Sequence, residues 1–294
     1  MELEYVSEDV AYIPGAVNIG VIIDEGRATL VDTGLDRDSG RGIMKLLEEN
    51  GIKVAAIINT HSHADHFGGN DYLVRNTGAT VYAPSVESGI IQNPILEPVY
   101  LFHGAAPIRN LRNKFVLAKP SPVHHILTPG ETTINGRDVK IVPLPGHSLN
   151  QVGVLVDDVL FCADTVFSER VIEKYRIPVV QDVGSHRDTL KALKETKHRL
   201  YVPSHTKPTE DITGLVERNL ETVETILADV LGMLDEPKST SEVQSELCSS
   251  YGLDVVQQYC LIHTTLMAYL GCLYEENSVE IRLEENSLRW AKAR

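Results

Sequence analysis

The sequence predicts a layered α/β domain followed by a smaller, mostly helical segment. Strand-like and helix-like patterns alternate up to about residue 210, polar motifs follow directly after apolar strand-like runs, and a long helical periodicity begins near residue 213. Alternating strands and helices are typical of α/β layers, and such sheets place ligand sites at the ends of their strands. At 294 residues the chain is long enough for one large domain or two modest ones.

The N-terminal region predicts a hairpin, a helix and a buried strand, in that order. Two apolar runs around a Glu-Gly turn indicate a hairpin over residues 17–31. Residues 38–50 carry apolar side chains at helical spacing and end in Asn-Gly, which predicts an amphipathic helix. The continuous apolar run of residues 54–58 is typical of a strand that is buried on both faces.

A later segment repeats the pattern of the first hairpin. Residues 20–33 and residues 153–165 both pair two apolar runs around a turn, and both return strands end in Asp-Thr. Two interpretations are open at this point. The chain contains a structural duplication, or two ordinary hairpins resemble each other.

The connection between these halves, residues 85–125, is expected to be an irregular insert. Five prolines interrupt it, and proline is excluded from the interior of long helices and central strands. Residues 95–125 carry four basic side chains and one acidic one, a local charge of +3 in a chain of net charge −14. A connection of this length is usually functional or disordered.

The C-terminal region predicts three helices and a hairpin, the outline of a winged-helix module. Apolar residues at helical spacing predict a long helix over 216–234. Ser239-x-x-Glu242 is a capping box that opens a second helix. A third helix is expected over 254–275, and residues 280–290 indicate the hairpin.

The charge of this C-terminal region opposes a role in nucleic-acid binding. No Lys or Arg occurs between Lys238 and Arg282, and residues 235–294 carry five basic and ten acidic side chains. Phosphate binding needs cationic contacts. The region is therefore expected to serve as a packing element, a dimerisation element or a wall of the active site.

Composition excludes several other classes of protein. Hydrophobic residues make up 43% and charged residues 23%, an ordinary globular balance. No apolar run reaches about 18 residues, so we expect no membrane-spanning helix. The acidic N-terminus lacks the apolar core of a secretory signal. Four scattered cysteines form no C-x-x-C pair, which favours a reducing, cytoplasmic location.

The strongest chemical signal is the motif H-x-H-x-D-H, which spans residues 61–66 directly after the buried strand. Four polar side chains in six residues cannot all be buried without partners. Neutral imidazole and carboxylate are natural ligands of zinc and similar divalent ions. So compact a turn can direct His61 and His63 to one ion and Asp65 and His66 to another.

Three more candidate ligands follow strand-like runs further along the chain. They are His147 after the run 139–144, Asp164 after 160–163, and His205 after 200–202. Taken alone, each would more often be a surface residue or a hydrogen-bonded core residue. Together with the first motif, they give the number of ligands that two metal ions require.

These motifs, in this order, resemble the metallo-β-lactamase superfamily, in particular its glyoxalase II-like hydrolase branch. The resemblance covers about residues 5–210 and is carried by four segments: Thr60-His61-Ser62-His63-Ala64-Asp65-His66, Pro145-Gly146-His147-Ser148, Cys162-Ala163-Asp164-Thr165 and Pro203-Ser204-His205. It implies an αββα sandwich of two face-to-face sheets with helices outside. We accordingly divide the chain into a catalytic domain, residues 1–212, and a helical winged-helix-like domain, residues 213–294.

The resemblance also implies a ligand set for two divalent ions, with zinc as the first candidate and iron or manganese as alternatives. By this resemblance His61, His63 and His147 hold the first ion, Asp65, His66 and His205 hold the second, and Asp164 bridges them. Asp32 matches a carboxylate that orients one of the ligand histidines. Cys162 is interpreted as a small core residue rather than a reactive thiol.

The function that follows is a metal-dependent hydrolase. A water between the ions would be activated as hydroxide and would cleave an ester, thioester or related bond of a small molecule, with Asp65 orienting the water or accepting its proton. Two alternatives are open: a persulfide dioxygenase with one iron held by two His and one Asp, and a phosphodiesterase or nuclease. A homodimer is also an open alternative.

The insert departs from the compact members of the family, because 81 residues separate His66 from His147. Both ends of the insert lie close in sequence to ligand motifs. We therefore predict that residues 95–120 form a lid in which Arg109, Arg112 or Lys114 binds an anionic part of the substrate. The alternatives are a solvated basic loop and an oligomerisation arm.

Overall fold

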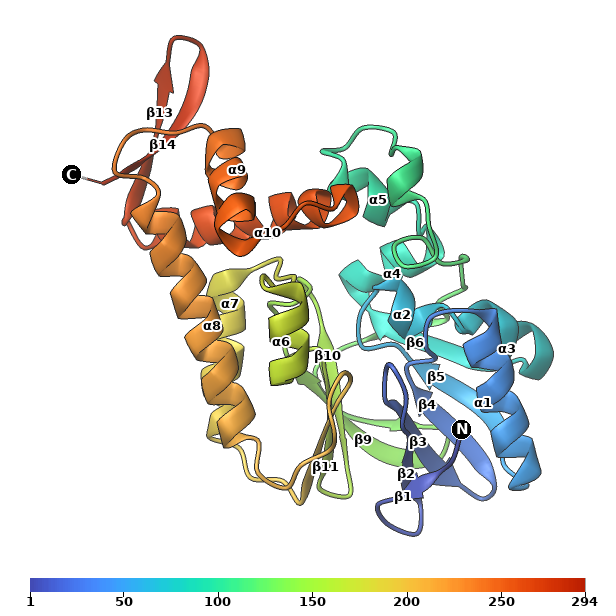
Figure 1. Cartoon of the computed structure of the whole chain (residues 1–294). Helices are drawn as coiled ribbons and strands as arrows, with labels where there is room; N and C mark the ends of the chain where they lie inside the picture. The colour runs from blue at the N-terminus through green and yellow to red at the C-terminus, as the bar shows by residue number, and fades with distance from the viewer. Residues whose placement is uncertain (294) are drawn as a thin grey trace.

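Two β-sheets packed face to face form the centre of the molecule in the computed structural model, which describes residues 1–293 (Figure 1). The first sheet has the order β1 (Glu4–Tyr5), β2 (Val10–Ile13), β3 (Ile19–Asp24), β4 (Arg27–Val31), β5 (Lys53–Ile58), β6 (Thr80–Pro84), β7 (His125–Leu127). The second has the order β12 (Leu200–Pro203), β11 (Val159–Ala163), β10 (Val152–Val156), β9 (Arg137–Pro143), β8 (Gly130–Ile134).

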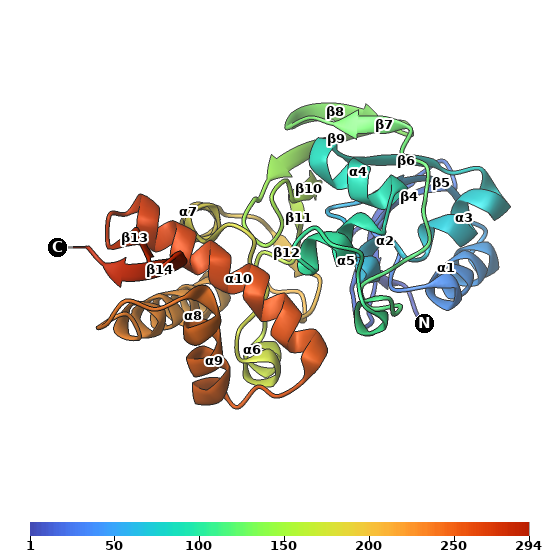
Figure 2. The ribbon, with the colours of Figure 1, turned by 90° about the horizontal axis from the view of Figure 1, so that it is seen from above.

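Helices cover the outer face of each sheet. Against the first sheet lie α1 (Arg37–Glu49) and α3 (Asn70–Thr77), while the short α2 (Ala64–Phe67) carries part of the ligand motif. Against the second sheet lie α7 (Val183–Lys194) and the start of α8 (Thr213–Gly232). The short α6 (Glu169–Tyr175) lies away from the strands, on the side of α8 and α9 (Thr240–Tyr251) (Figure 2). The expected αββα sandwich is confirmed.

Three apolar layers hold the sandwich together. Between the sheets, Ile22 and Ile58 pack in one cluster with Val154 and Phe161. The outer layers bury the opposite faces of the same sheets, one against α1 and α3, the other against α7 and α8. Because central strands such as β11 are buried on both faces, their sequences are continuously apolar rather than alternating.

The two halves share one strand topology. Strands β2, β3 and β4 are antiparallel neighbours and β4 runs parallel to β5. Strands β9, β10 and β11 repeat this arrangement, and β11 runs parallel to β12. The match extends beyond the two hairpins seen in the sequence, which favours a duplication over a chance likeness of hairpins.

The insert is more regular than its prolines suggested. It contains α4 (Ser85–Gln92), α5 (Leu96–Leu101) and the short 3₁₀ helix η1 (Arg109–Leu111), so the expectation of an irregular segment is wrong for these residues. Pro94 precedes α5 and Pro98 lies in its first turn, where proline is tolerated because the backbone N–H has no helical partner.

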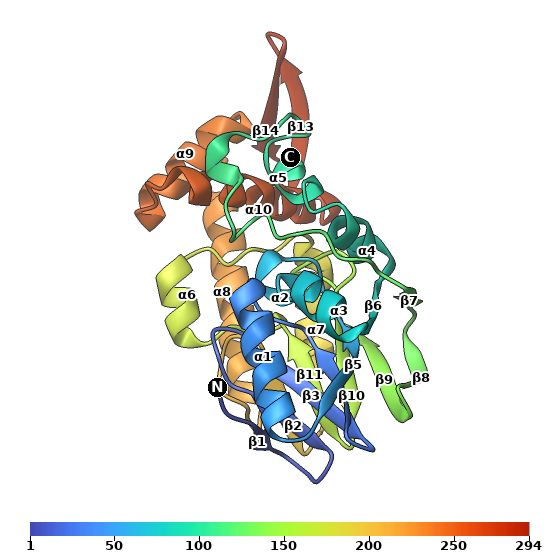
Figure 3. The same ribbon diagram turned by 90° about the vertical axis from the view of Figure 1, so that its right-hand side faces the viewer.

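The C-terminal helices and hairpin are present where the periodicity predicted them. They are α8, α9 (Thr240–Tyr251), α10 (Val256–Glu275), β13 (Val279–Glu284) and β14 (Ser287–Lys292). The capping box of Ser239 and Glu242 is formed in full. The hairpin projects away from the sandwich (Figures 1 and 3). The winged-helix interpretation of these elements stays a prediction.

The C-terminal region packs directly on the sandwich. Its apolar core includes Ile177 and Val180 from the segment before α7 and Val183 from the start of that helix. Helix α10 contacts the insert, where the Asn113 side chain donates to Gln257 at 3.1 Å. Helix α8 contributes Val216 to the sandwich and Val223 to the C-terminal core. The division at residue 212 therefore falls at the start of a helix that serves both cores. None of the helices within residues 1–293 combines the length and the apolar character needed to cross a membrane.

Candidate metal centre

The candidate ligands lie where the carboxyl ends of the central strands meet. The motif loop follows β5, Asp164 follows β11, and His205 comes shortly after β12. Backbone hydrogen bonds join the loops of the two sheets at this edge: Val152 N donates to the Thr60 carbonyl at 3.0 Å, and Asn18 N donates to the Ser204 carbonyl at 2.9 Å. Both sheets therefore fix the positions of the ligand loops.

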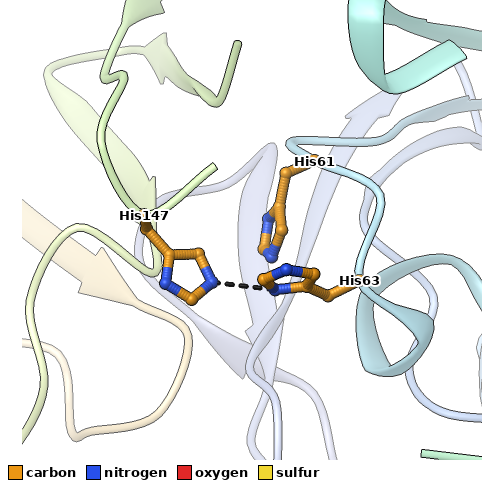
Figure 4. A group of neighbouring side chains, drawn as sticks. All are labelled: His61, His63 and His147. Carbon is orange, nitrogen blue, oxygen red and sulfur yellow. Dashed lines mark hydrogen bonds between the residues drawn. The ribbon is translucent and has the colours of Figure 1, made fainter. Parts of the chain in front are cut away.

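All seven predicted ligands converge on this edge. Their donor atoms form three overlapping groups in which every atom lies within 4.8 Å of the others: His61, His63 and His147; His61, His66 and Asp164; and Asp65, His66 and His205. Figure 4 shows the first group, with a dashed line joining one ring nitrogen of His63 to one of His147. In that group His147 Nε2 lies 2.9 Å from His63 Nδ1.

Asp164 stands between the two ends of the cluster. Its Oδ1 lies 3.3 Å from His66 Nε2, and its Oδ2 lies 3.5 Å from His147 Nε2 and 3.2 Å from His205 Nε2. A carboxylate that reaches ligands of both predicted ions through both oxygens is placed as a bridging ligand would be.

The donor set fits a divalent cation. His61 Nε2, His66 Nε2 and Asp164 Oδ1 are buried, and no hydrogen-bond partner for them exists within residues 1–293. Buried polar atoms are normally paired, so three unpaired ones that lie within 4.8 Å of one another are typical of a site that takes a ligand from outside the chain. Imidazole nitrogen and carboxylate oxygen are ligands that zinc accepts.

The electrostatics of the cluster point the same way. Burial, reinforced by neighbouring histidines, holds the pKa of His61 well below its usual value and lowers the pKa of His147 to about 3. Both imidazoles are therefore neutral at pH 7, as metal ligands must be. Burial alone would lower the pKa of His205, but Asp164 outweighs it and raises the pKa to about 9. In the metal-free chain Asp164 therefore stabilises the protonated, positively charged form of His205.

Hydrogen bonds from outside the cluster orient the ligand rings. Asp32 Oδ2 lies 2.8 Å from His66 Nδ1, so the predicted contact of Asp32 with a ligand histidine is present. The Val179 carbonyl lies 2.8 Å from His147 Nδ1, and the Ala16 carbonyl lies 2.7 Å from His205 Nδ1. With one ring nitrogen directed outward to a protein acceptor, the other faces the cluster, where it can bind a metal ion once it is deprotonated.

Gly146 sets the backbone before His147. Its φ is +133°, and a Cβ atom on it would lie 2.4 Å from the backbone of His186. The Gly146 carbonyl accepts hydrogen bonds from Gln181 N and Asp182 N. Only glycine fits this conformation and this close approach, so Gly146 is what lets the His147 loop lie against helix α7.

Two buried carboxylates of the insert were missed in the sequence. Glu87 in α4 accepts hydrogen bonds from Ser62 and Ser148, and Glu97 in α5 is buried near Asp65 and Glu87. Burial, with those two carboxylates, raises the pKa of Glu97 well above its usual value. A lone glutamate in a segment expected to be irregular gave no signal, because its role depends on tertiary contacts.

The basic residues of the insert lie on its outer side. Arg109, Arg112 and Lys114 are exposed, and Lys114 pairs with Asp36 at 3.0 Å. Within residues 1–293 none of the three forms a hydrogen bond or ion pair with a candidate ligand. Their role toward a substrate stays a prediction. Cys162 is fully buried in the core, and burial raises the pKa of its thiol, as expected for a packing residue.

Comparison with known proteins gives a consistent result. A family model described as Metallo-beta-lactamase superfamily matches residues 12–205. The chain is 30% identical over 138 residues to a hydroxyacylglutathione hydrolase of Shewanella pealeana, a match that covers 46% of this chain but only 41% of that protein. It is 26% identical over 252 residues to the lactamase-like protein adaB of Aspergillus niger, covering 81% of this chain and 68% of that one.

Solved structures share the fold. A metallo-beta-lactamase family protein from Thermus thermophilus aligns with a TM-score of 0.76 at 19% identity, over 98% of this chain and 100% of its own. The subclass B3 metallo-beta-lactamase BJP-1 of Bradyrhizobium japonicum aligns with a TM-score of 0.60 at 18% identity, over 78% of this chain and 94% of its own. The first alignment extends across the C-terminal helices as well.

Proposed function

This chain belongs to the metallo-beta-lactamase superfamily, and we propose that it is a hydrolase that uses two divalent metal ions, zinc before iron or manganese, to cleave an ester, thioester or related bond of a small molecule. The observation that carries the proposal is the cluster of seven His and Asp side chains with three buried donor atoms unpaired. Such a cluster supplies a complete ligand set for two ions. The similarity to a protein named as a hydroxyacylglutathione hydrolase supports a hydrolytic reaction.

We assign three roles to the residues of the cluster: binding the first ion, binding the second ion, and accepting a proton. His61, His63 and His147 would hold one ion and Asp65, His66 and His205 the other, and Asp164, which lies close to His66, His147 and His205, would be a ligand shared by both. When bound, the ions lower the pKa of a water molecule and polarise the bond to be cleaved. Asp65 is the more exposed of the two aspartates, with 37% of its side chain accessible. It can therefore meet both the water and the substrate and accept a proton.

Metal analysis of the purified protein tests the proposal. We expect two ions per chain and metal-dependent turnover in a panel of thioesters, lactones and phosphodiesters, with activity lost after chelation and restored by zinc. One iron per chain, with oxygen consumption on a persulfide, would instead establish the dioxygenase alternative. Turnover of phosphodiesters alone would favour the nuclease alternative.

The exposed cations of the insert lead to a prediction on substrate binding. If Arg109 and Arg112 attract an anionic substrate, replacing both by glutamine should raise KM for an anionic substrate by about tenfold, the effect of roughly 1.4 kcal/mol. Metal content should not change, because neither residue contacts a ligand. KM for a neutral substrate of the same bond type is the control. An equal change for both substrates would show that the insert does not select for charge.

A further inference from the structure

The carboxylate of Glu87 is the centre of a hydrogen-bond network between two ligand loops. The side chain is 1% exposed and comes from α4. Its Oε2 accepts from Ser62 N at 3.0 Å and from Ser62 Oγ at 2.5 Å. Its Oε1 accepts from Ser148 Oγ at 2.8 Å and from Asn150 N at 3.1 Å. Each oxygen thus serves one loop.

The bonded serines are neighbours of candidate ligands in the sequence. Ser62 lies between His61 and His63, and Ser148 directly follows His147. These three histidines are the group that would hold the first ion. They come from opposite sheets, because the motif loop follows β5 and the His147 loop joins β9 to β10. Glu87 therefore connects the two loops whose separation determines the geometry of the first metal site.

The contact between α4 and the His147 loop is reciprocal. Asn150 Oδ1 accepts from Ser85 Oγ at 3.1 Å and from Val86 N at 3.3 Å at the first turn of α4. Asn150 N in turn donates to Glu87. The start of the helix and the loop satisfy each other's polar groups, so these hydrogen bonds attach α4 to the His147 loop.

Only an ionised carboxylate satisfies all four donors. It offers about four acceptor positions, two on each oxygen, and the four hydrogen bonds use them all. A glutamine of the same shape has one acceptor oxygen and one donor NH₂ group. Its NH₂ group would face either the Ser62 amide or the Asn150 amide, and a backbone N–H cannot become an acceptor.

We propose that Glu87 is a positioning residue that sets the separation of the His61–His63 loop and the His147 loop, and thereby the affinity of the first metal site. The proposal rests on the proposed function and deepens it, because it assigns to the insert a role in metal binding. The second group, Asp65, His66 and His205, receives no hydrogen bond from Glu87, so its affinity is expected to be independent of this residue.

Two backgrounds that each leave one site intact make the test specific. Zn²⁺ titration of the metal-free protein is measured in a His205→Ala background, which keeps the first site, and in a His63→Ala background, which keeps the second. Adding Glu87→Gln should weaken Zn²⁺ binding by about 10–100-fold in the first background and leave it unchanged in the second. Ser88→Ala is the matched control, because Ser88 is a buried neighbour on α4 whose hydroxyl bonds only within the helix, to the Ser85 carbonyl at 2.7 Å.

Equal weakening in both backgrounds, or none in either, would overturn the proposal. If Glu87→Gln does not fold, the double variant Ser62→Ala/Ser148→Ala removes one hydroxyl donor from each loop and keeps the carboxylate. Weaker Zn²⁺ binding in the first background alone would then support the proposal, and equal weakening or no weakening in both backgrounds would overturn it. Failure of the proposed function is distinguishable, because it is read from the metal content and turnover of the wild-type chain, whereas the Glu87 proposal is read from the difference in Zn²⁺ affinity between the two backgrounds.

Discussion

Replacing Asp164 by alanine is expected to lower metal-dependent turnover by more than about 100-fold. Loss of a residue that only hydrogen-bonds to a metal ligand costs up to about 100-fold, and loss of a ligand itself should cost more. We propose Asp164 as a direct ligand, because its Oδ1 lies near His66 and its Oδ2 lies near His147 and His205, so that it reaches candidate ligands of both predicted ions. In the proposed two-ion site neither ion would keep its full set of ligands without this carboxylate, and two divalent cations would lose a shared negative charge. Metal content should therefore fall below one ion per chain.

The Asp164→Ala chain should still fold. The side chain lies at the edge of the sandwich, and the apolar layers that stabilise the fold do not include it. Far-ultraviolet circular dichroism and thermal unfolding of the metal-free proteins check this. Asp254→Ala, the same change at an exposed position of the C-terminal region, is the control. Near wild-type turnover together with full metal occupancy would contradict the bridging role.

The convergence of the candidate ligands could be predicted from the sequence because they are marked by local signals. Four ligands fall within residues 61–66, and each of the others follows an apolar strand run. A parallel strand delivers the residue at its carboxyl end to one edge of the sheet, so position along the chain determines position in the site. The C-terminal helices were predictable for a similar reason, since their periodicity and capping box are local.

The insert could not be predicted in the same way. Glu87 became visible only when α4 was placed against Ser62 and Ser148, which are 25 and 61 residues away in the chain. Pro98 looked like a helix breaker, yet it occupies a first turn, where its missing N–H costs nothing. Both errors concern residues whose role depends on which distant segment they contact. Positional patterns in the sequence do not contain that information.

Asp32 gives the second prediction, and here two substitutions should separate stability from metal binding. Asp32 is 2% exposed. Its Oδ1 accepts from Thr60 N at 2.9 Å, and its Oδ2 accepts from Thr60 Oγ1 at 2.8 Å and contacts His66 Nδ1 at 2.8 Å. Its φ of +65° lies in the left-handed region, which asparagine tolerates and alanine does not.

Asp32→Ala should therefore be the less stable variant. It leaves the Thr60 amide and the His66 ring without their acceptor, at about 1–3 kcal/mol for each buried unpaired group, and it adds the strain of alanine at positive φ. Asp32→Asn keeps an acceptor for the Thr60 amide and fits the backbone. In denaturant unfolding of the metal-free proteins, the free energy of unfolding of Asp32→Ala should be several kcal/mol lower than that of the wild type, by the sum of these terms. The free energy of unfolding of Asp32→Asn should be clearly higher than that of Asp32→Ala.

Metal binding should not follow this order. In Asp32→Asn the new NH₂ group faces His66 Nδ1, and two donors cannot pair, so the ring relieves the conflict by moving its proton to Nε2. That nitrogen is the one that faces Asp164 and the second candidate site. The better-folded variant should thus bind the second ion about 10–100-fold more weakly than the wild type. Against the effect of burial, neighbouring carboxylates raise the pKa of His66 in the metal-free chain, so nitrogen NMR of the metal-free variant is recorded at a pH where this ring is neutral, and it should show the His66 proton on Nε2. A variant with the proton still on Nδ1 and with wild-type affinity would mean that Asp32 supports the loop without orienting the ligand.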